Sequence, residues 1–169
     1  MTTTQPMQDV LKTCSLHALL LVTSKMLARS GFGDVQILDR REKRQKSRFG
    51  GHELLCETTL GSLSIRIVVK VINDAVRLRM LDELSGVVAR TKADLGILIS
   101  PHHVTSSARR HQVAFREAHV EVMDGERLAG RLVSLGIGVR PKGSVDYGFF
   151  WSLEEASQRI AALMREEGL

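Results

Sequence analysis

Residues 52–72 decide the fold class, because the stretch HELLCETTLGSLSIRIVVKVI predicts a β-hairpin. In its second half, apolar side chains occupy every second position, which is the period of a strand with one buried face. Gly61 and Ser62 suit a two-residue turn that begins with glycine. The stretch therefore predicts two antiparallel strands, at residues 53–60 and 63–72.

The register of this hairpin can be counted outward from its turn. Leu60 opposes Leu63, and every second pair outward shares one face of the hairpin. The face opposite Ile65, Ile67 and Val69 then carries three facing pairs: Glu57 with Arg66, Leu55 with Val68, and Glu53 with Lys70. The last of these pairs is expected near the end of the hairpin that is distant from the turn.

The facing Glu53 and Lys70 have two interpretations. The structural one is a cross-strand ion pair, which contributes a fraction of a kcal/mol when exposed. A second pair of the same kind, Glu57 with Arg66, favours it. The functional one is a metal-dependent phosphodiesterase site, in which the carboxylate holds Mg²⁺ and the lysine positions or activates the attacking water. The pair alone leaves both interpretations open.

The rest of the chain predicts helices and strands on both sides of the hairpin. We expect helices at residues 9–30, from 73 or 74 to 92, from 105 or 106 onward, after Asp124, and from Ser152, where Ser152 and Glu155 form a capping box. Further strands are expected at residues 34–38, 95–100 and 119–123. Alternation in the second half predicts an α/β domain with a central mixed sheet flanked by helices.

A single domain accounts for the length of 169 residues. We expect a flexible N-terminus at residues 1–8, the main domain at 9–135, and a C-terminal extension at 136–169. The terminal helix of the extension is expected to pack on the same domain. Its aromatic residues Phe149, Phe150 and Trp151 either cover the core or form a self-association patch.

The formal net charge of +5 favours an anionic partner such as nucleic acid, although a basic protein without such a partner is an alternative. Arg109 and Arg110, on one expected helix, could contact phosphates. A basic run is either a phosphate-contacting arm or a solvated loop. It consists of Arg40, Arg41, Lys43, Arg44, Lys46 and Arg48.

Both cysteines, Cys14 and Cys56, lie in apolar segments and are expected to be reduced core residues of a cytoplasmic protein. No secretory signal and no apolar run long enough to span a bilayer is evident, so no membrane partner is expected. His102 and His103 follow the predicted strand at 95–100, where α/β sheets often bind ligands. A solvated turn is the alternative for these two histidines.

Five short motifs occur along the chain in a particular order. They are Ser30-Gly31-Phe32, Gly50-Gly51-His52-Glu53-Leu54, Val68-Val69-Lys70, Thr105-Ser106-Ser107-Ala108-Arg109 and Asp124-Gly125. Their order and spacing resemble the catalytic domain of Mrr-type restriction endonucleases, over roughly residues 19–133. The resemblance implies a restriction-endonuclease-like three-layer α/β fold, DNA as the partner and Mg²⁺ as the cofactor. It also implies that Glu53 is a metal ligand and that Lys70 positions water or stabilises charge.

Three departures from the family pattern bear on activity. Glu53 replaces the metal-binding aspartate of the family and keeps a carboxylate there. Val68 stands where the family has a glutamine or glutamate, and the first helix is apolar near Leu19 and Leu20, where the family often has an acidic residue. Two hypotheses follow. One is a metal-dependent endodeoxyribonuclease. The other is a catalytically degenerate module for DNA binding or protein interaction, compatible with a homodimer.

Overall fold

The central hairpin forms in the register that its turn predicts. In the computed structural model, which describes residues 3–33, 35–38 and 51–166, β2 (His52–Leu60) pairs antiparallel with β3 (Leu63–Val71). Leu60 opposes Leu63, and Glu53 opposes Lys70. Gly61 has a φ of 61°, a left-handed value that glycine adopts without steric cost.

One mixed sheet is built around this hairpin, as the sequence predicts. Its strand order is β1-β2-β3-β4-β5. The short β1 (Gln36–Ile37) pairs antiparallel with β2, whereas β4 (Leu95–Ile99) and β5 (Val120–Met123) continue from β3 in parallel. Strand β3 is therefore in the middle, with the antiparallel part of the sheet on one side and the parallel part on the other.

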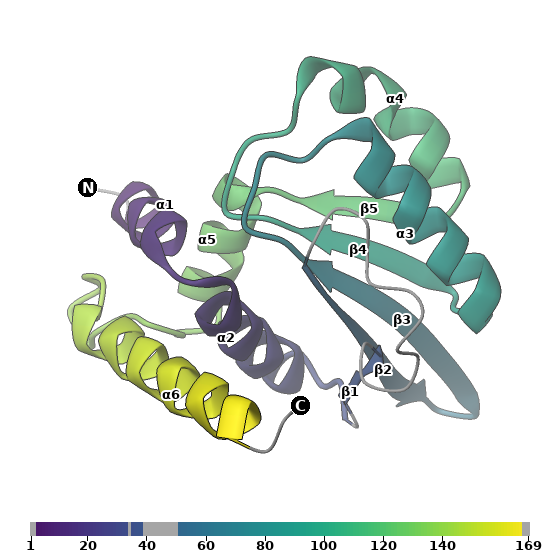
Figure 1. Cartoon of the computed structure of the whole chain (residues 1–169). Coiled ribbons are helices and arrows are strands. Elements are labelled where there is room, and N and C mark those ends of the chain that lie inside the picture. Colours follow the sequence, from purple (N-terminus) through teal and green to yellow (C-terminus); the bar gives the residue numbers. More distant parts are fainter. Residues whose placement is uncertain (1–2, 34, 39–50, 167–169) are drawn as a thin grey trace.

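Helices cover both faces of the sheet and create two separate cores (Figure 1). On one face lie α1 (Thr4–Thr13), α2 (Leu16–Arg29), α5 (Gly125–Ser134) and α6 (Tyr147–Glu166). On the other face lie α3 (Leu78–Thr91) and α4 (Ser106–Glu117). Val69 and Val71 point into the first core, while Val68 and Ile72 point into the second. The inner part of β3, from Ile67 to Val71, thus buries both of its faces.

The first predicted helix is in fact two helices. The break lies at Cys14 and Ser15, both with extended backbone, and the Ser15 hydroxyl caps α2 by accepting from the Ala18 amide at 3.1 Å. Residues 4–8, expected to belong to a flexible N-terminus, form part of α1 instead, because the fully buried Met7 anchors them in the core.

Two other helix starts differ from the prediction. Helix α3 begins at Leu78, because Asp74 accepts from the adjacent Ala75 amide in a turn and does not cap a helix. Helix α6 begins at Tyr147, so Ser152 is inside it and donates to the Phe149 carbonyl.

Both cysteines are free thiols in the core, as expected. Burial raises the pKa of each thiol to about 11. Both are therefore protonated and unreactive near neutral pH.

None of the helices among the described residues is both long and apolar enough to cross a lipid bilayer.

Candidate active site

Lys70 is the most unusual residue of the fold, because its side chain is entirely buried in the middle strand of the sheet. Its neighbours along β3, Val69 and Val71, point to the opposite face. An isolated ammonium group taken out of water costs several kcal/mol, so a buried lysine needs charged partners that compensate for its lost hydration.

Two carboxylates compensate for the lost hydration of the Lys70 ammonium group. The Nζ atom donates to the Oε2 atom of Glu83 at 2.6 Å and lies 3.5 Å from the Oε1 atom of Glu53. The side chains of Glu53 and Glu83 are 14% and 23% exposed, so the cluster reaches solvent through its carboxylates. The three residues, named here the Glu53–Lys70–Glu83 cluster, join β2, β3 and α3 at one point.

Glu83 is the functional candidate that the sequence reasoning missed. It lies in α3, whose buried residues Met80, Leu84 and Val87 face the sheet. Position 83 belongs to the same stripe, since residues three and four apart share a helix face. The sequence feature that could have identified Glu83 is its place within this apolar stripe, because an acidic residue on a packed helix face needs a cation opposite it.

The second ion pair of the hairpin, between Arg66 and Glu57, is an ordinary exposed pair. Arg66 Nε lies 2.6 Å from Glu57 Oε1, and both side chains are more than 40% exposed. This pair therefore fits the structural interpretation of a cross-strand ion pair. Burial of the lysine distinguishes the Glu53–Lys70–Glu83 cluster from it.

The structure also shows what occupies the positions where the family pattern led us to expect polar ligands. Val68 is fully buried and packs in the α3–α4 core. Leu19 and Leu20 of α2 pack in the core on the other face of the sheet. Neither region contributes a polar group near Lys70, so Glu83 supplies the second carboxylate from a different element.

The two carboxylates fit a hard divalent cation. Mg²⁺ is commonly held by one or two carboxylates, with water and substrate oxygens completing its coordination. Glu53 and Glu83 both approach the same Nζ atom, so their oxygens point toward one small region. Among the described residues, no group of three or more His, Cys, Asp or Glu side chains could hold a metal.

The other sequence-predicted candidates lie elsewhere. Arg109 and Arg110 are exposed at the start of α4 and, with Val104 and Ser106, line a shallow hollow. His102 Nε2 forms a hydrogen bond with Asn73 Oδ1 at 3.0 Å, and His103 is exposed. The basic run lies outside the described residues, at Arg40, Arg41, Lys43, Arg44, Lys46 and Arg48.

A mixed sheet flanked by helices, with a charged cluster at the junction of its antiparallel and parallel parts, defines a restriction-endonuclease-like α/β domain. The chain belongs to the Mrr-type restriction endonuclease family, since the family model Mrr_cat, described as "Restriction endonuclease", matches residues 11–132. This match confirms the family resemblance noted in the sequence. No curated protein matches the chain.

Solved structures of restriction endonucleases resemble this chain at low sequence identity, and the likeness with a TM-score above 0.5 shows the same fold. One is "DNA modification-dependent restriction endonuclease AspBHI", with 15% identity and a TM-score of 0.52, covering 95% of this chain and 40% of that one. Another is "MspJI Restriction Endonuclease in Complex with 27-mer Oligonucleotide", with 16% identity and a TM-score of 0.49, covering 92% of this chain and 34% of that one. The chain thus spans less than half the length of either structure.

Proposed function

We propose that this domain hydrolyses phosphodiester bonds of DNA with the help of Mg²⁺, using the Glu53–Lys70–Glu83 cluster. The observation that carries the proposal is the complete burial of Lys70 between two partly exposed carboxylates. Such an arrangement is costly to assemble for stability alone, because well-packed apolar side chains usually serve a core as well or better. Membership of a restriction endonuclease family supports the choice of reaction.

Each residue of the cluster has a role in this proposal. Glu53 and Glu83 would hold the cation, which when bound would supply Lewis-acid stabilisation of the charge on the scissile phosphodiester. Lys70 Nζ is a three-proton donor fixed in position by its burial. It would donate a hydrogen bond to the attacking water or to a phosphate oxygen and place positive charge beside the developing negative charge.

Cleavage of DNA by single-residue variants tests this proposal. Purified protein would be incubated with plasmid and linear DNA in Mg²⁺, in Mn²⁺ or in chelator. We expect metal-dependent cutting that Glu53→Gln, Glu83→Gln and Lys70→Met each abolish. Glu57→Gln is the matched control, because it removes a carboxylate from the same strand and the same face, where the partner is Arg66. It should leave cutting intact.

The catalytically degenerate module remains the competing function, and a specific observation favours it. Val68 is apolar at the position where the family pattern expects a metal-binding or water-binding side chain, and its burial leaves no room for such a group. Absence of cutting in both metals, together with tight and salt-sensitive DNA binding, would establish this alternative. Cutting that survives Glu83→Gln would instead remove Glu83 from the mechanism.

Partners and location belong to the same proposal. DNA is the proposed substrate, with Arg109 and Arg110 among the phosphate contacts, and the basic run of residues 40–48 is proposed as a further contact. A cytoplasmic location agrees with the free, buried thiols of Cys14 and Cys56. A homodimer stays a prediction that sedimentation can test, and Tyr147 and Trp151 on α6, 59% and 70% exposed, are the side chains to replace.

A further inference from the structure

The loops that follow β3 and β4 run side by side next to the candidate active site. Val76 and Val104 form a parallel bridge between them. The Val76 amide donates to the His103 carbonyl at 2.9 Å, and the Thr105 amide donates to the Val76 carbonyl at 3.0 Å. These bonds fix the beginnings of α3 and α4 relative to each other.

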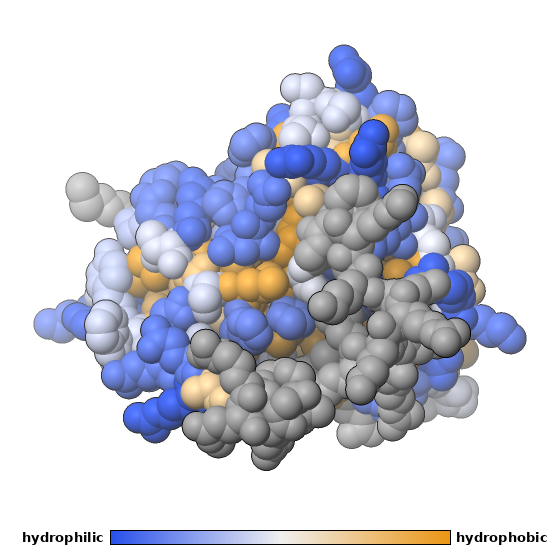
Figure 2. Space-filling view, in the orientation of Figure 1, coloured by the Kyte–Doolittle hydropathy of each residue, from blue (hydrophilic) through white to orange (hydrophobic). Residues whose placement is uncertain are grey.

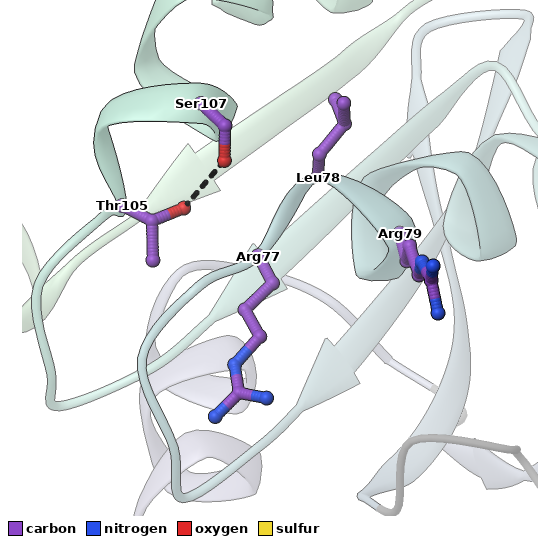
Figure 3. Close-up of a pocket in the computed structure, with 5 residues that line it drawn as sticks. All are labelled: Arg77, Leu78, Arg79, Thr105 and Ser107. Carbon is purple, nitrogen blue, oxygen red and sulfur yellow. Dashed lines mark hydrogen bonds between the residues drawn. The ribbon is translucent and has the colours of Figure 1, made fainter.

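Four exposed arginines stand at these two helix beginnings. Arg77 and Arg79 flank Leu78 at the start of α3, and Arg109 and Arg110 lie in the first turns of α4. In Figure 3 the side chains of Arg77 and Arg79 extend to the same side, opposite to that of Leu78. Figure 2 shows strongly hydrophilic residues gathered where α3 and α4 begin.

Most of this positive charge is not neutralised by a neighbouring carboxylate. Arg77 pairs with Asp74 at 3.2 Å, a pair in which both side chains are more than half exposed. Arg79, Arg109 and Arg110 form no ion pair with any other residue that the structure describes. Uncompensated arginines at fixed positions repel one another and attract polyanions.

Hydroxyl groups lie between the two pairs of arginines. Thr105 and Ser107 line one shallow hollow together with Arg77, Leu78 and Arg79, and their hydroxyl oxygens are 3.3 Å apart (Figure 3). Ser106 lines the adjoining hollow with Arg109 and Arg110. Arginines, short hydroxyl side chains and helix beginnings are the groups that proteins use to contact DNA phosphates.

Helix geometry connects this surface to the Glu53–Lys70–Glu83 cluster. Arg79 precedes Glu83 by four residues in α3, and residues with this spacing are neighbours on one helix face, about 6 Å apart. A DNA strand with its scissile phosphate at Glu83 would therefore place an adjacent phosphate within reach of Arg79.

We infer that the beginnings of α3 and α4 form a DNA-backbone-binding surface that guides one strand into the candidate active site, with Arg79 and Arg110 as its principal contacts. This inference rests on the proposed function and adds the path of the strand to it. Because the contacts are to phosphates, the surface reads no base sequence.

Salt dependence of DNA binding tests the surface separately from catalysis. Binding of a short fluorescent duplex would be measured by anisotropy in chelator, so that no DNA is cut. The test variant is Arg79→Gln with Arg110→Gln. The control is Arg90→Gln with Arg159→Gln, which removes the same charge from the far end of α3 and from α6, at residues that are also exposed.

The expected result is a reduction of about two in the slope of log affinity against log salt for the test variant, one for each lost contact. The reduction should be the same for two duplexes of unrelated sequence, and the control should keep the wild-type slope. Equal slopes in the test variant and the wild type, or equal reductions in the test and control variants, would overturn the inference.

Failure of this inference can be told apart from failure of the proposed function. If the wild type binds and cuts DNA while the test variant keeps its slope, the proposed function stands and the path of the strand is wrong. If the wild type does not bind DNA at all, both proposals fall. Urea unfolding of all variants should show unchanged midpoints, because the four substituted side chains are exposed.

Discussion

At the scale of single residues, the balance of charge around Lys70 determines how the candidate site affects the stability of the fold. One ammonium group faces two carboxylates, so its removal leaves two like charges close together and only partly hydrated. Lys70→Met keeps most of the side-chain volume and removes the positive charge together with the hydrogen bond to Glu83. We expect it to lower the free energy of unfolding by about 2 kcal/mol, less than for a fully buried pair because both carboxylates reach solvent.

A double-mutant cycle in urea would measure the coupling between Lys70 and Glu83. Glu83→Leu alone removes the nearer of the two carboxylates from the buried ammonium group, so it should also lower the free energy of unfolding. Lys70→Met combined with Glu83→Leu should be more stable than the sum of the two single effects predicts, since an apolar pair can replace a buried ion pair at little cost. Strict additivity would show that the 2.6 Å contact carries no net energy.

Single residues also show how far the sequence alone could lead to this site. The pairing of Glu53 with Lys70 followed from the Gly61-Ser62 turn, because hairpin register is a local property that can be counted. Glu83 did not follow, because its approach to Lys70 depends on how α3 packs across the sheet. Burial of Lys70 was likewise inaccessible, since the alternation along β3 does not reveal that a helix covers the polar face as well.

At the scale of elements, the packing of α3 on β4 controls the distance between Glu83 and Lys70. Gly96 in β4 makes this packing possible, because a Cβ atom there would lie 2.6 Å from Val88 Cγ2 and 3.2 Å from Leu84 Cγ. Gly96→Ala should therefore displace α3, lower the free energy of unfolding by about 1–3 kcal/mol and reduce DNA cutting.

Gly86 on α3 provides the matched control for Gly96. A Cβ atom at this position meets only the end of the Arg90 side chain, at 3.5 Å. Gly86→Ala should stabilise the protein by about 0.5–1 kcal/mol, because alanine favours the helical backbone, and it should leave cutting unchanged. Loss of cutting in Gly86→Ala but not in Gly96→Ala would contradict this account of the helix–sheet contact.

The sequence predicted the boundaries of helices least well, because contacts between residues that are distant in sequence determine them. Ser15 breaks the predicted first helix because Glu154 of α6 accepts from both its amide and its hydroxyl group, at 2.5 Å and 2.7 Å. The same hydroxyl caps α2. A capping box at Ser152 and Glu155 was a plausible local pattern, but the packing of Phe149 and Phe150 extends α6 past it.

At the scale of the whole molecule, two histidines are in contact where the helical layer that contains α2 packs on the hairpin. The rings of His17 in α2 and His52 in β2 are 5.1 Å apart, edge to face. Burial and the neighbouring His52 lower the pKa of His17, against an opposing effect of Glu154. Neutral His17 is thus the form that the folded protein prefers.

The sign of the resulting pH dependence follows from proton linkage. Because the pKa of His17 is lower in the folded than in the unfolded protein, the unfolded chain binds more protons, and acidification favours unfolding. The stability contributed by neutral His17 is complete above the ordinary histidine pKa of about 6.5 and is lost as the pH falls through the folded pKa. The helical layer should then separate from the hairpin together with global unfolding, since both share one core.

A variant without a titratable group at position 17 separates the pH dependence due to His17 from that due to the other histidines and the carboxylates. The free energy of unfolding would be measured by urea titration at several pH values, from about 7.5 down to about 5, for the wild type and for His17→Gln. We expect the wild type to lose more stability than His17→Gln over this interval, because only the wild type gains a proton at position 17 on unfolding. Parallel curves for the two proteins would show that His17 does not link protonation to folding, and that the contact between α2 and the hairpin is insensitive to pH.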